Sequence, residues 1–557
     1  MRLPSIGSTG TTIPTIGPSP VALKLNSEIH RPTGGHMNRF RLSNLGLIAL
    51  MFLALWGCMD LAVDNQNNPD RARAIVSAKD VESIISGSFL TWWSGTQKDN
   101  NYPALTLSTI ADVHTSSWGN FGMQDLSSEP RTPFNNSPSY GYAGVCQDTW
   151  YAMYRAISSV NDGLAAINSG LKIVDAQTPT IDNTMRAKAF GKFVQGLSHA
   201  WLAVFFDKAF IFDETMDLTN PPLQYKTYNE VMVAAIKMLE DCIAICNSNT
   251  FTIPNTWING VTLTNTELKR VAYSYLARFR AGVARTPAER AAVNWAKVIS
   301  DAQSGVTADW GPVGDGNLWW DGLKFRGQHG ATWTRADYKS IAITDKSGRY
   351  QTWLNTAVAS RNVFVIDTDD RRITGTAGGT SNGTDFKYRT PSPFRDDRGT
   401  YHHSLYYHAR YEYHVLAGAT GALPTILVAE LDMTIAEGLW RTGGSKQQIV
   451  DLINKTRVTR GKLAPVTTAM TNDELLKWVK YEKVIECFST AGGLTWMDRR
   501  GWGDLISGSI LHFPVPGKEL EILQQSLYTY GGVGGQGAAP KRSLVDFLAP
   551  LRSIHPE

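Results

Sequence analysis

Apolar residues recur at three- and four-residue steps through much of the chain, which is the pattern of amphipathic helices. The predicted helices span 147–169, 184–206, 227–246 and 265–283, with a shorter one around Trp295, Val298 and Ile299. The first four begin about 40 residues apart, a spacing typical of stacked helical hairpins such as tetratricopeptide repeats. We therefore predict a mainly α-helical fold built from tetratricopeptide-like hairpins.

The helical pattern stops at about residue 304. From there to about residue 422, Gly, Thr, Asp, Arg and aromatic residues mix without a period. We expect long irregular loops with a few short strands, and a loop segment of this length in a compact domain usually has a function. Further helices are predicted over 426–440, 446–459 and 472–488. The glycine-rich segment 531–540 is expected to be flexible from its composition.

One segment near the N-terminus has the composition of an export signal. Within residues 37–57, Arg39 and Arg41 precede an apolar run that ends at Leu55-Trp56-Gly57, directly before Cys58. The run is too short for a membrane span, which needs about 20 residues, and its order is that of a cleaved secretory signal. A cysteine at this place resembles a bacterial lipobox, so we predict that Cys58 is acylated and becomes the mature N-terminus. The alternative is an ordinary secretory signal that contains a cysteine.

These patterns define the predicted domains. Residues 1–36, rich in Pro, Gly, Ser and Thr, are a disordered extension or precede the true start at Met37. Residues 37–57 are the lipoprotein signal peptide. Residues 58–557 form one domain, which is helical to about 303, loop-rich over about 304–422 and helical again over about 423–530.

Charge and cysteine content exclude several classes of protein. The net charge of +4 equals that of residues 1–57 alone, so the mature chain is near neutral and lacks the basic footprint of a nucleic-acid-binding protein. Five cysteines in 557 residues are too few for a disulfide-built scaffold. Cys242 and Cys246 share one face of a predicted helix, and we expect both to be buried as small apolar residues. We predict no metal and no cofactor.

Five groups of residues between 67 and 520 match, in order, the motifs of one family. They are Asn67-Asn68-Pro69-Asp70; Trp150, Tyr154, Ile157 and Asn161; residues 186–190 with Phe205-Phe206-Asp207; Glu430 and Glu437 with Ile453-Asn454 and Arg457; and the block 482–502 followed by residues 512–520. This series of motifs, which follows the lipobox in the sequence, resembles the SusD/RagB family of outer-membrane nutrient-binding lipoproteins. Asp207 and Thr495 depart from the family pattern, which has glycine and arginine there, and Ala491-Gly492 replaces an acidic residue and a glycine.

The resemblance implies a largely helical fold with tetratricopeptide-like hairpins that carry surfaces built from loops. It also implies a non-enzymatic role: the protein would bind a glycan or similar nutrient at the cell surface and deliver it to a TonB-dependent transporter in the outer membrane. The membrane attachment would be the lipid on Cys58.

The candidate ligand residues are aromatic and polar side chains in irregular segments, because ligand pockets combine apolar walls with a few placed polar groups. They are Trp118, Trp319, Trp320, Asp321, Trp333, Tyr350 and Trp353, with Asn317 and Arg335 as further hydrogen-bonding groups. Trp118 lies on an early loop of the kind that the family uses near its ligand. Simple packing in the core is the competing interpretation for each aromatic residue.

Two alternative functions are also open. Glu430 and Glu437 lie two helical turns apart, so they point the same way and fit the acid/base pair of a lipid-anchored glycan hydrolase. The resemblance instead implies a structural role, in which they cap a helix or pair near Arg457. A tetratricopeptide-type periplasmic scaffold that binds another protein is the third functional class.

Two further sequence patterns give only weak evidence for a binding site. The histidines of one aromatic-rich segment are His402, His403, His408 and His414. In a single strand, those on one face would spread over roughly 40 Å, too far for one metal ion. Residues 532–537 match a dinucleotide-binding fingerprint literally, but no βαβ unit follows, so we reject that function.

Overall fold

The computed structural model describes residues 77–98, 102–175, 178, 180–216, 224–328, 333–376, 378–391, 394 and 403–540. Packing divides the chain after Pro69, and all of the described residues belong to the second unit, Asp70–Glu557. The predictions for residues 1–57 and for Cys58 lie outside the described residues.

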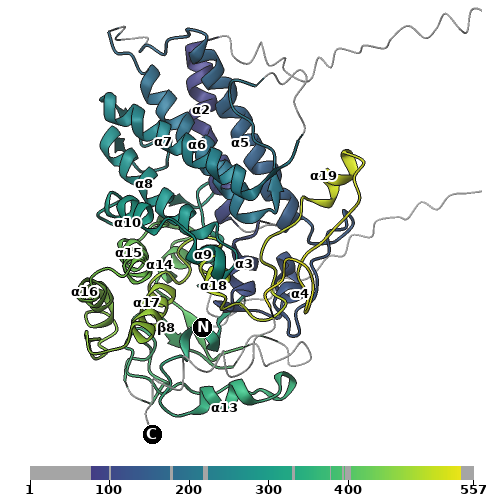
Figure 1. The fold of residues 1–557 in the computed structure, drawn as a ribbon, viewed down its shortest axis with the longest axis vertical. Helices are drawn as coiled ribbons and strands as arrows, with labels where there is room; N and C mark the ends of the chain where they lie inside the picture. Colours follow the sequence, from purple (N-terminus) through teal and green to yellow (C-terminus); the bar gives the residue numbers. More distant parts are fainter. Residues whose placement is uncertain are drawn as a thin grey trace, which may run out of the picture. The chain divides into compact units, whose positions relative to one another are not determined.

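Long helices packed against one another form most of this unit (Figure 1). They are α2 (Ala78–Gln97), α5 (Gly144–Asn168), α6 (Thr184–Phe205), α7 (Tyr228–Ser248), α8 (Asn265–Gly282), α10 (Trp295–Gln303), α15 (Val428–Thr442), α16 (Lys446–Arg457) and α17 (Asn472–Glu486). Each contacts the next in this order as far as α15, which packs on both α16 and α17. The predicted fold class, mainly α with tetratricopeptide-like hairpins, is confirmed.

Three of these helices begin with the same sequence motif, a threonine followed three residues later by a glutamate. The pairs are Thr227 with Glu230, Thr264 with Glu267, and Thr471 with Glu474. Each threonine hydroxyl accepts the backbone N–H of the glutamate, and each glutamate accepts the backbone N–H of the threonine. This capping box pairs N–H groups that have no carbonyl partner inside the helix, so the sequence fixes where α7, α8 and α17 start.

The connecting segments hold short helices and two-stranded antiparallel sheets. The sheets pair β1 (His114–Thr115) with β7 (Arg335–Ala336), β2 (Lys208–Ala209) with β3 (Lys226–Thr227), β4 (Thr252–Ile253) with β5 (Leu263–Thr264), β6 (Val313–Asp315) with β10 (Thr420–Ala422), and β8 (Phe386–Tyr388) with β9 (Tyr406–His408). The short helices are α3 (Ala104–Ile110), η1 (Asn120–Gly122), α4 (Met123–Ser127), α9 (Pro287–Ala291), α11 (Gly322–Arg326), α12 (Tyr338–Ile341), α13 (Arg349–Asn355), η2 (Val358–Ser360), α14 (Glu412–Leu416), α18 (Leu494–Trp502) and α19 (Gly517–Ile522). The irregular middle segment was therefore predicted correctly.

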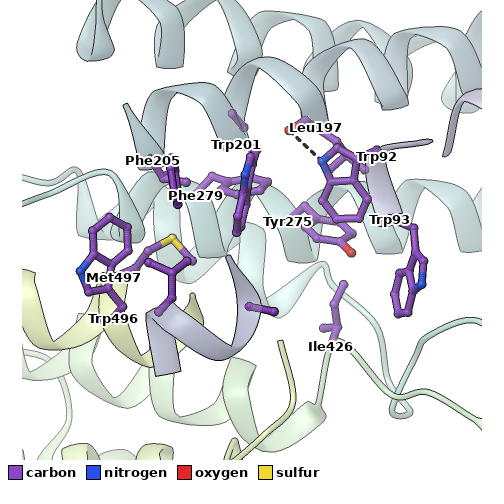
Figure 2. Close-up of a cluster of buried hydrophobic side chains, with 14 of the residues drawn as sticks. Trp92, Trp93, Leu197, Trp201, Phe205, Tyr275, Phe279, Ile426, Trp496 and Met497 are labelled. Atoms are coloured by element: carbon purple, nitrogen blue, oxygen red, sulfur yellow. Dashed lines mark hydrogen bonds between the residues drawn. The ribbon is translucent and has the colours of Figure 1, made fainter. Parts of the chain in front are cut away.

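Aromatic side chains from helices far apart in sequence meet in the core (Figure 2). Trp92 of α2 lies edge-on to Tyr275 of α8, with ring centroids 5.6 Å apart. The indole N–H of Trp92 donates to the carbonyl of Leu197, and that of Trp201 donates to the Thr149 hydroxyl. Because each of these buried N–H groups has a partner, the large rings add apolar contact without the cost of an unpaired donor.

Buried arginines bind the two glutamates of α15. Arg278 makes a bidentate pair with Glu430, at 2.7 Å for each contact, and Arg290 does the same with Glu437, at 2.9 and 2.6 Å. The structural role implied for the glutamates is confirmed, but the predicted partner is wrong. Arg457 instead lies 3.9 Å from the ring centroid of Trp478, because the α8–α9 segment, not the end of α16, faces this side of α15.

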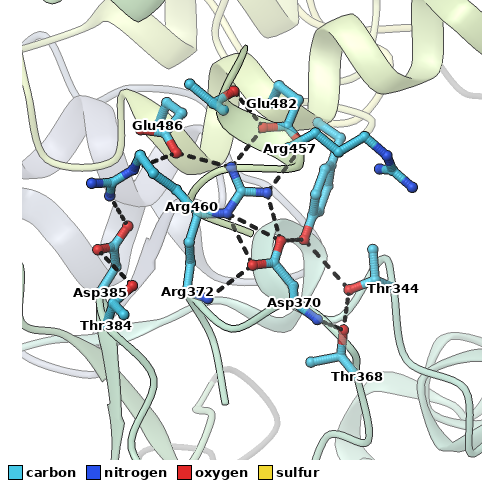
Figure 3. A network of polar contacts seen from close by, with 12 residues as sticks. Thr344, Thr368, Asp370, Arg372, Thr384, Asp385, Arg457, Arg460, Glu482 and Glu486 are labelled. Atoms are coloured by element: carbon cyan, nitrogen blue, oxygen red, sulfur yellow. Dashed lines mark hydrogen bonds and ion pairs between the residues drawn. The ribbon is translucent and has the colours of Figure 1, made fainter. Parts of the chain in front are cut away.

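A second polar network ties the irregular middle segment to α16 and α17 (Figure 3). Arg372, fully buried, donates to Asp370, Glu482 and Glu486 at distances between 2.6 and 3.2 Å. The Tyr481 hydroxyl also donates to Asp370, at 2.6 Å. A charge buried in this way is stable only when opposite charges and hydrogen bonds surround it, so the network fixes the loop at residues 368–374 against α17.

The glycine-rich tail is ordered, so the prediction of flexibility is wrong. The N–H of Gly532 donates to Gly508, and that of Ala539 donates to Ser509. Gly531, Gly532, Gly534 and Gly537 have positive φ, a conformation that glycine adopts without a steric penalty. Glycine here permits a tightly folded, hydrogen-bonded path.

Two other expectations, for the cysteines and for the histidines, can be compared with the structure. Cys242 and Cys246 are buried, as predicted. His408 ends β9 whereas His414 lies in α14, so the histidines do not share one strand, and His402 lies outside the described residues. In the part of the chain that the structure describes, no cluster of three or more candidate metal-ligating side chains occurs. The same described residues contain no helix with the length and apolar character needed to cross a bilayer.

Candidate ligand-binding surface

The structure separates the seven candidate residues into two groups by burial. Four lie in the interior, with exposed fractions of 6% or less: Trp319, Asp321, Tyr350 and Trp353. The other three, Trp118, Trp320 and Trp333, are half-buried and keep part of their surface in solvent. Only this second group is placed to meet a ligand without a rearrangement of the fold.

Each of the buried candidates has partners inside the protein. Trp319 packs on Phe89 and Trp93 of α2, with centroid distances of 6.1 and 6.2 Å. Asp321 caps α11, because its carboxylate accepts the backbone N–H of Lys324 at 2.9 Å and the ammonium of the same residue at 3.0 Å. These contacts explain how Trp319 and Asp321 hold the β6–α11 loop in place.

Tyr350 and Trp353 lie on α13 and stabilise the loop beside it. Trp353 packs edge-on against Tyr338, with centroids 5.5 Å apart, and the Arg361 guanidinium lies 4.3 Å from its ring centroid. Burial raises the pKa of the Tyr350 hydroxyl above its usual range. Of the two further polar candidates, Asn317 is exposed and Arg335 is buried in β7.

Trp118, Trp320, Phe325 and Trp333 belong to one connected group, which we call the aromatic band. The Ser116 hydroxyl donates to the carbonyl of Trp333 at 2.9 Å and accepts the backbone N–H of Trp118 at 3.2 Å. Trp320 lies edge-on to Phe325 at 5.7 Å. Three separate segments of the chain therefore contribute half-buried aromatic residues that these contacts connect.

Arg326 joins the two halves of the aromatic band. Its guanidinium carbon lies 4.7 Å from the ring centroid of Trp333 and 5.2 Å from that of Phe325. Phe121 stacks on Trp333 with an interplanar angle of 11°. Phe121 and Arg326 therefore both contact the Trp333 ring.

The core fixes the backbone beneath the aromatic band. The indole N–H of Trp93, fully buried in α2, donates to the carbonyl of Trp320 at 3.2 Å. Pairing of β1 with β7 holds the segment that follows Trp333 beside the segment that precedes Trp118. The band is thus a preformed surface, which reduces the entropy lost when a ligand binds.

Sequence reasoning missed two aromatic residues at this surface, Phe325 and Tyr142. Phe325 follows Trp320 by five positions, at the end of the WWDGLKF segment, and its spacing gave a weak signal. Tyr142 lies against Gly119, where a Cβ atom would approach the Tyr142 hydroxyl oxygen to 2.9 Å. That contact joins segments 23 residues apart, and no local pattern reveals it.

Neither a known protein-family profile nor a curated protein sequence matches this chain. Solved structures do match it. A SusD-like carbohydrate-binding protein from Bacteroides fragilis NCTC 9343 is 14% identical with a TM-score of 0.53, over 85% of this chain and 96% of that chain. A SusD-like carbohydrate-binding protein from Bacteroides vulgatus ATCC 8482 is 13% identical with a TM-score of 0.50, over 86% and 98% of the two chains. A SusD superfamily protein from the same strain is 15% identical with a TM-score of 0.50, over 80% and 97%.

The helical stack and its loop-built surface define the class of this protein as a mainly α-helical, tetratricopeptide-like fold with long irregular segments. The similar solved structures identify which fold of this class the chain has. The chain has the SusD-like fold, as its sequence motifs predicted.

Proposed function

We propose that the protein binds an oligosaccharide on the aromatic band and delivers it to a TonB-dependent transporter in the outer membrane, where a lipid on Cys58 anchors it at the cell surface. The observation that carries the proposal is the connected, half-exposed set of Trp118, Trp320, Phe325 and Trp333 on a SusD-like frame. Two of the similar solved structures are named as carbohydrate-binding proteins, which supports a glycan as the ligand.

The buried glutamates support binding rather than hydrolysis. A glycosidase needs two carboxyl groups on either side of the bond that breaks, with the pKa of the acid raised. Glu430 and Glu437 are 1% and 0% exposed, and each is held by an arginine. Pairing with Arg290 outweighs burial and lowers the pKa of Glu437 far below its usual range, the opposite of what a general acid needs. Release of product from an oligosaccharide by the purified protein would overturn the non-enzymatic assignment.

A periplasmic scaffold that binds another protein remains the third class. Such a protein would present a concave helical groove to its partner and would need no aromatic band on its loops. Protease treatment of intact cells distinguishes the two classes, since a surface receptor is cleaved and a periplasmic scaffold is protected.

The proposal predicts that replacing both Trp118 and Trp320 with alanine abolishes most oligosaccharide binding. Truncating an aromatic residue at the centre of a binding surface costs about 2 kcal/mol, so each substitution should weaken the affinity roughly 30-fold. Isothermal titration with oligosaccharides from plant and microbial glycans measures this. Trp440→Ala is the matched control, because Trp440 is half-buried on α15 and donates to Asn472. Equal affinity in the double variant and the control would refute the role of the aromatic band.

A second prediction concerns the membrane anchor. Cells grown with a palmitate analogue should label the wild-type protein and not Cys58→Ala, because acylation needs the thiol at that position. The variant should also move from the membrane fraction to the soluble fraction, since stable attachment rests on the acyl chains. Label on the Cys58→Ala protein would contradict lipidation at this residue.

A further inference from the structure

A second group of aromatic and charged side chains lies away from the aromatic band, where β2, β3, α5 and α19 meet. Its members are Tyr151 of α5, Lys208 of β2, Tyr225 just before β3, Glu519 of α19 and Tyr528, all of them half-buried. We call this group the Lys208 site. Asp207 lies beside it and accepts the hydroxyls of Tyr528 and Tyr530 at 3.0 and 3.1 Å.

Lys208 lies between two tyrosine rings. Its ammonium nitrogen is 4.8 Å from the ring centroid of Tyr225 and 4.9 Å from that of Tyr528. An ammonium group has three N–H donors, and among the described residues none of the hydrogen bonds or ion pairs of the fold uses them. The ring faces stabilise the charge but leave its donors available.

The Lys208 site also contains a carboxyl group and tyrosine hydroxyls that lack strong hydrogen-bond partners. Burial raises the pKa of Glu519, whose carboxyl group faces the hydroxyl of Tyr151, and no lysine or arginine of the described residues forms an ion pair with it. The Tyr225 hydroxyl is buried without a hydrogen-bond partner in the part of the chain that the structure describes. Tyr225 also interacts electrostatically with both Glu519 and Asp207, whose negative charges help to raise the pKa of its hydroxyl.

The charged groups and hydroxyls of the Lys208 site determine which kind of ligand it can bind. Each hydroxyl of a sugar both donates and accepts a hydrogen bond, so it satisfies a carboxylate and an ammonium or phenol at once. The site holds both signs of charge, Lys208 beside Glu519 and Asp207, so an acidic or an amino sugar would meet at least one like charge, whereas a neutral sugar meets none.

We propose that the Lys208 site is a second ligand site that binds one neutral pyranose through Lys208, Tyr225 and Glu519. The frame around it is rigid. Phe210 stacks on Tyr225 with centroids 4.3 Å apart, and Asp207 fixes the Tyr528 ring through its hydroxyl. The site shares no residue with the aromatic band, so its occupancy does not depend on the function proposed for that band.

The test uses the mature protein with Trp118→Ala and Trp320→Ala, so that the aromatic band does not contribute. The probe is a mixture of D-glucose, D-galactose, D-mannose and D-xylose, and the readout is saturation-transfer difference NMR. At least one sugar should give a signal. Tyr225→Phe and Glu519→Gln should each weaken its binding about tenfold, the effect of one lost hydrogen bond to a charged or buried group.

Controls separate binding from folding. Lys226→Met changes a lysine on the adjoining strand that bonds Gln224, and Tyr413→Phe removes an exposed hydroxyl that donates to Ala422. Both should keep the signal, and all four variants should keep the thermal midpoint of the parent. No signal from any neutral sugar, equal signal after Tyr225→Phe and Glu519→Gln, or stronger signal from galacturonate or glucosamine would overturn the proposal. Each of these results is independent of whether oligosaccharides bind the aromatic band.

Discussion

Replacing Arg372 with methionine is expected to destabilise the protein by about 3–5 kcal/mol, the usual cost of removing one partner from a buried ion pair. The arginine is 0% exposed and pairs with Asp370, Glu482 and Glu486. Methionine fills a similar volume, so the loss comes from three carboxylates that remain buried without their shared cation. Urea unfolding followed by circular dichroism measures the change in the free energy of unfolding.

The neighbouring Arg371 provides the matched control for Arg372. It is partly exposed and lies 3.7 Å from Asp369, which is itself half-exposed, so Arg371→Met should cost less than about 1 kcal/mol.

Burial already raises the pKa of Glu482 beside Arg372. Without the arginine the pKa rises further, and the variant should regain stability as the pH falls below neutral. A cost for Arg372→Met as small as that for Arg371→Met would show that the network contributes little.

The second large effect is expected at Glu437 of α15, whose carboxylate joins this helix to α9 and α18. It accepts Arg290 at 2.9 and 2.6 Å, Arg441 at 2.8 Å and the indole N–H of Trp502 at 3.1 Å. Glu437→Gln removes the charge and leaves Arg290, which is 0% exposed, paired only with Asp498. We expect a loss of about 3 kcal/mol in the free energy of unfolding at neutral pH.

The pH dependence of this loss has a definite sign. The arginines hold the pKa of Glu437 far below the ordinary value of 4.5. A carboxyl group with a lowered pKa in the folded protein stabilises it fully above the unfolded value, and that stability is lost as the pH falls below it. The difference between wild type and Glu437→Gln should therefore be constant above about pH 5 and shrink in more acidic solution. Glu240→Gln, at a surface pair with Arg280, should show almost no difference at any pH.

The helices could be predicted because the residues that determine a helix are close together in the sequence. Apolar spacing predicted the limits of α7, α8 and α17 to within a few residues, and the Thr-x-x-Glu pairs that cap these helices are equally local. Helix α2 was missed although Val81, Ile85, Phe89 and Trp92 follow the same period. Its serines, threonines and glycines have low helix propensity, and packing on α5 and α6 supplies the stability that its composition lacks.

The ligand surface was predictable only in part, because exposure of a side chain depends on contacts between distant segments. Trp319 and Trp320 are adjacent and alike in sequence, yet one is 6% exposed and packs on α2 while the other is half-buried in the aromatic band. The Lys208 site escaped prediction for the same reason. Its residues come from four regions between Tyr151 and Tyr528, and no spacing along the chain brings them together.

The adjacent tryptophans have a consequence for how this protein can evolve. Trp319 anchors the loop from within, and Trp93 holds the carbonyl of Trp320, so the loop keeps its path whatever side chain stands at position 320. Under the function that we propose for the aromatic band, substitutions at this position would change ligand preference with little effect on folding. Selection for a different ligand would then act on position 320, and selection for stability on position 319, so the two need not constrain each other.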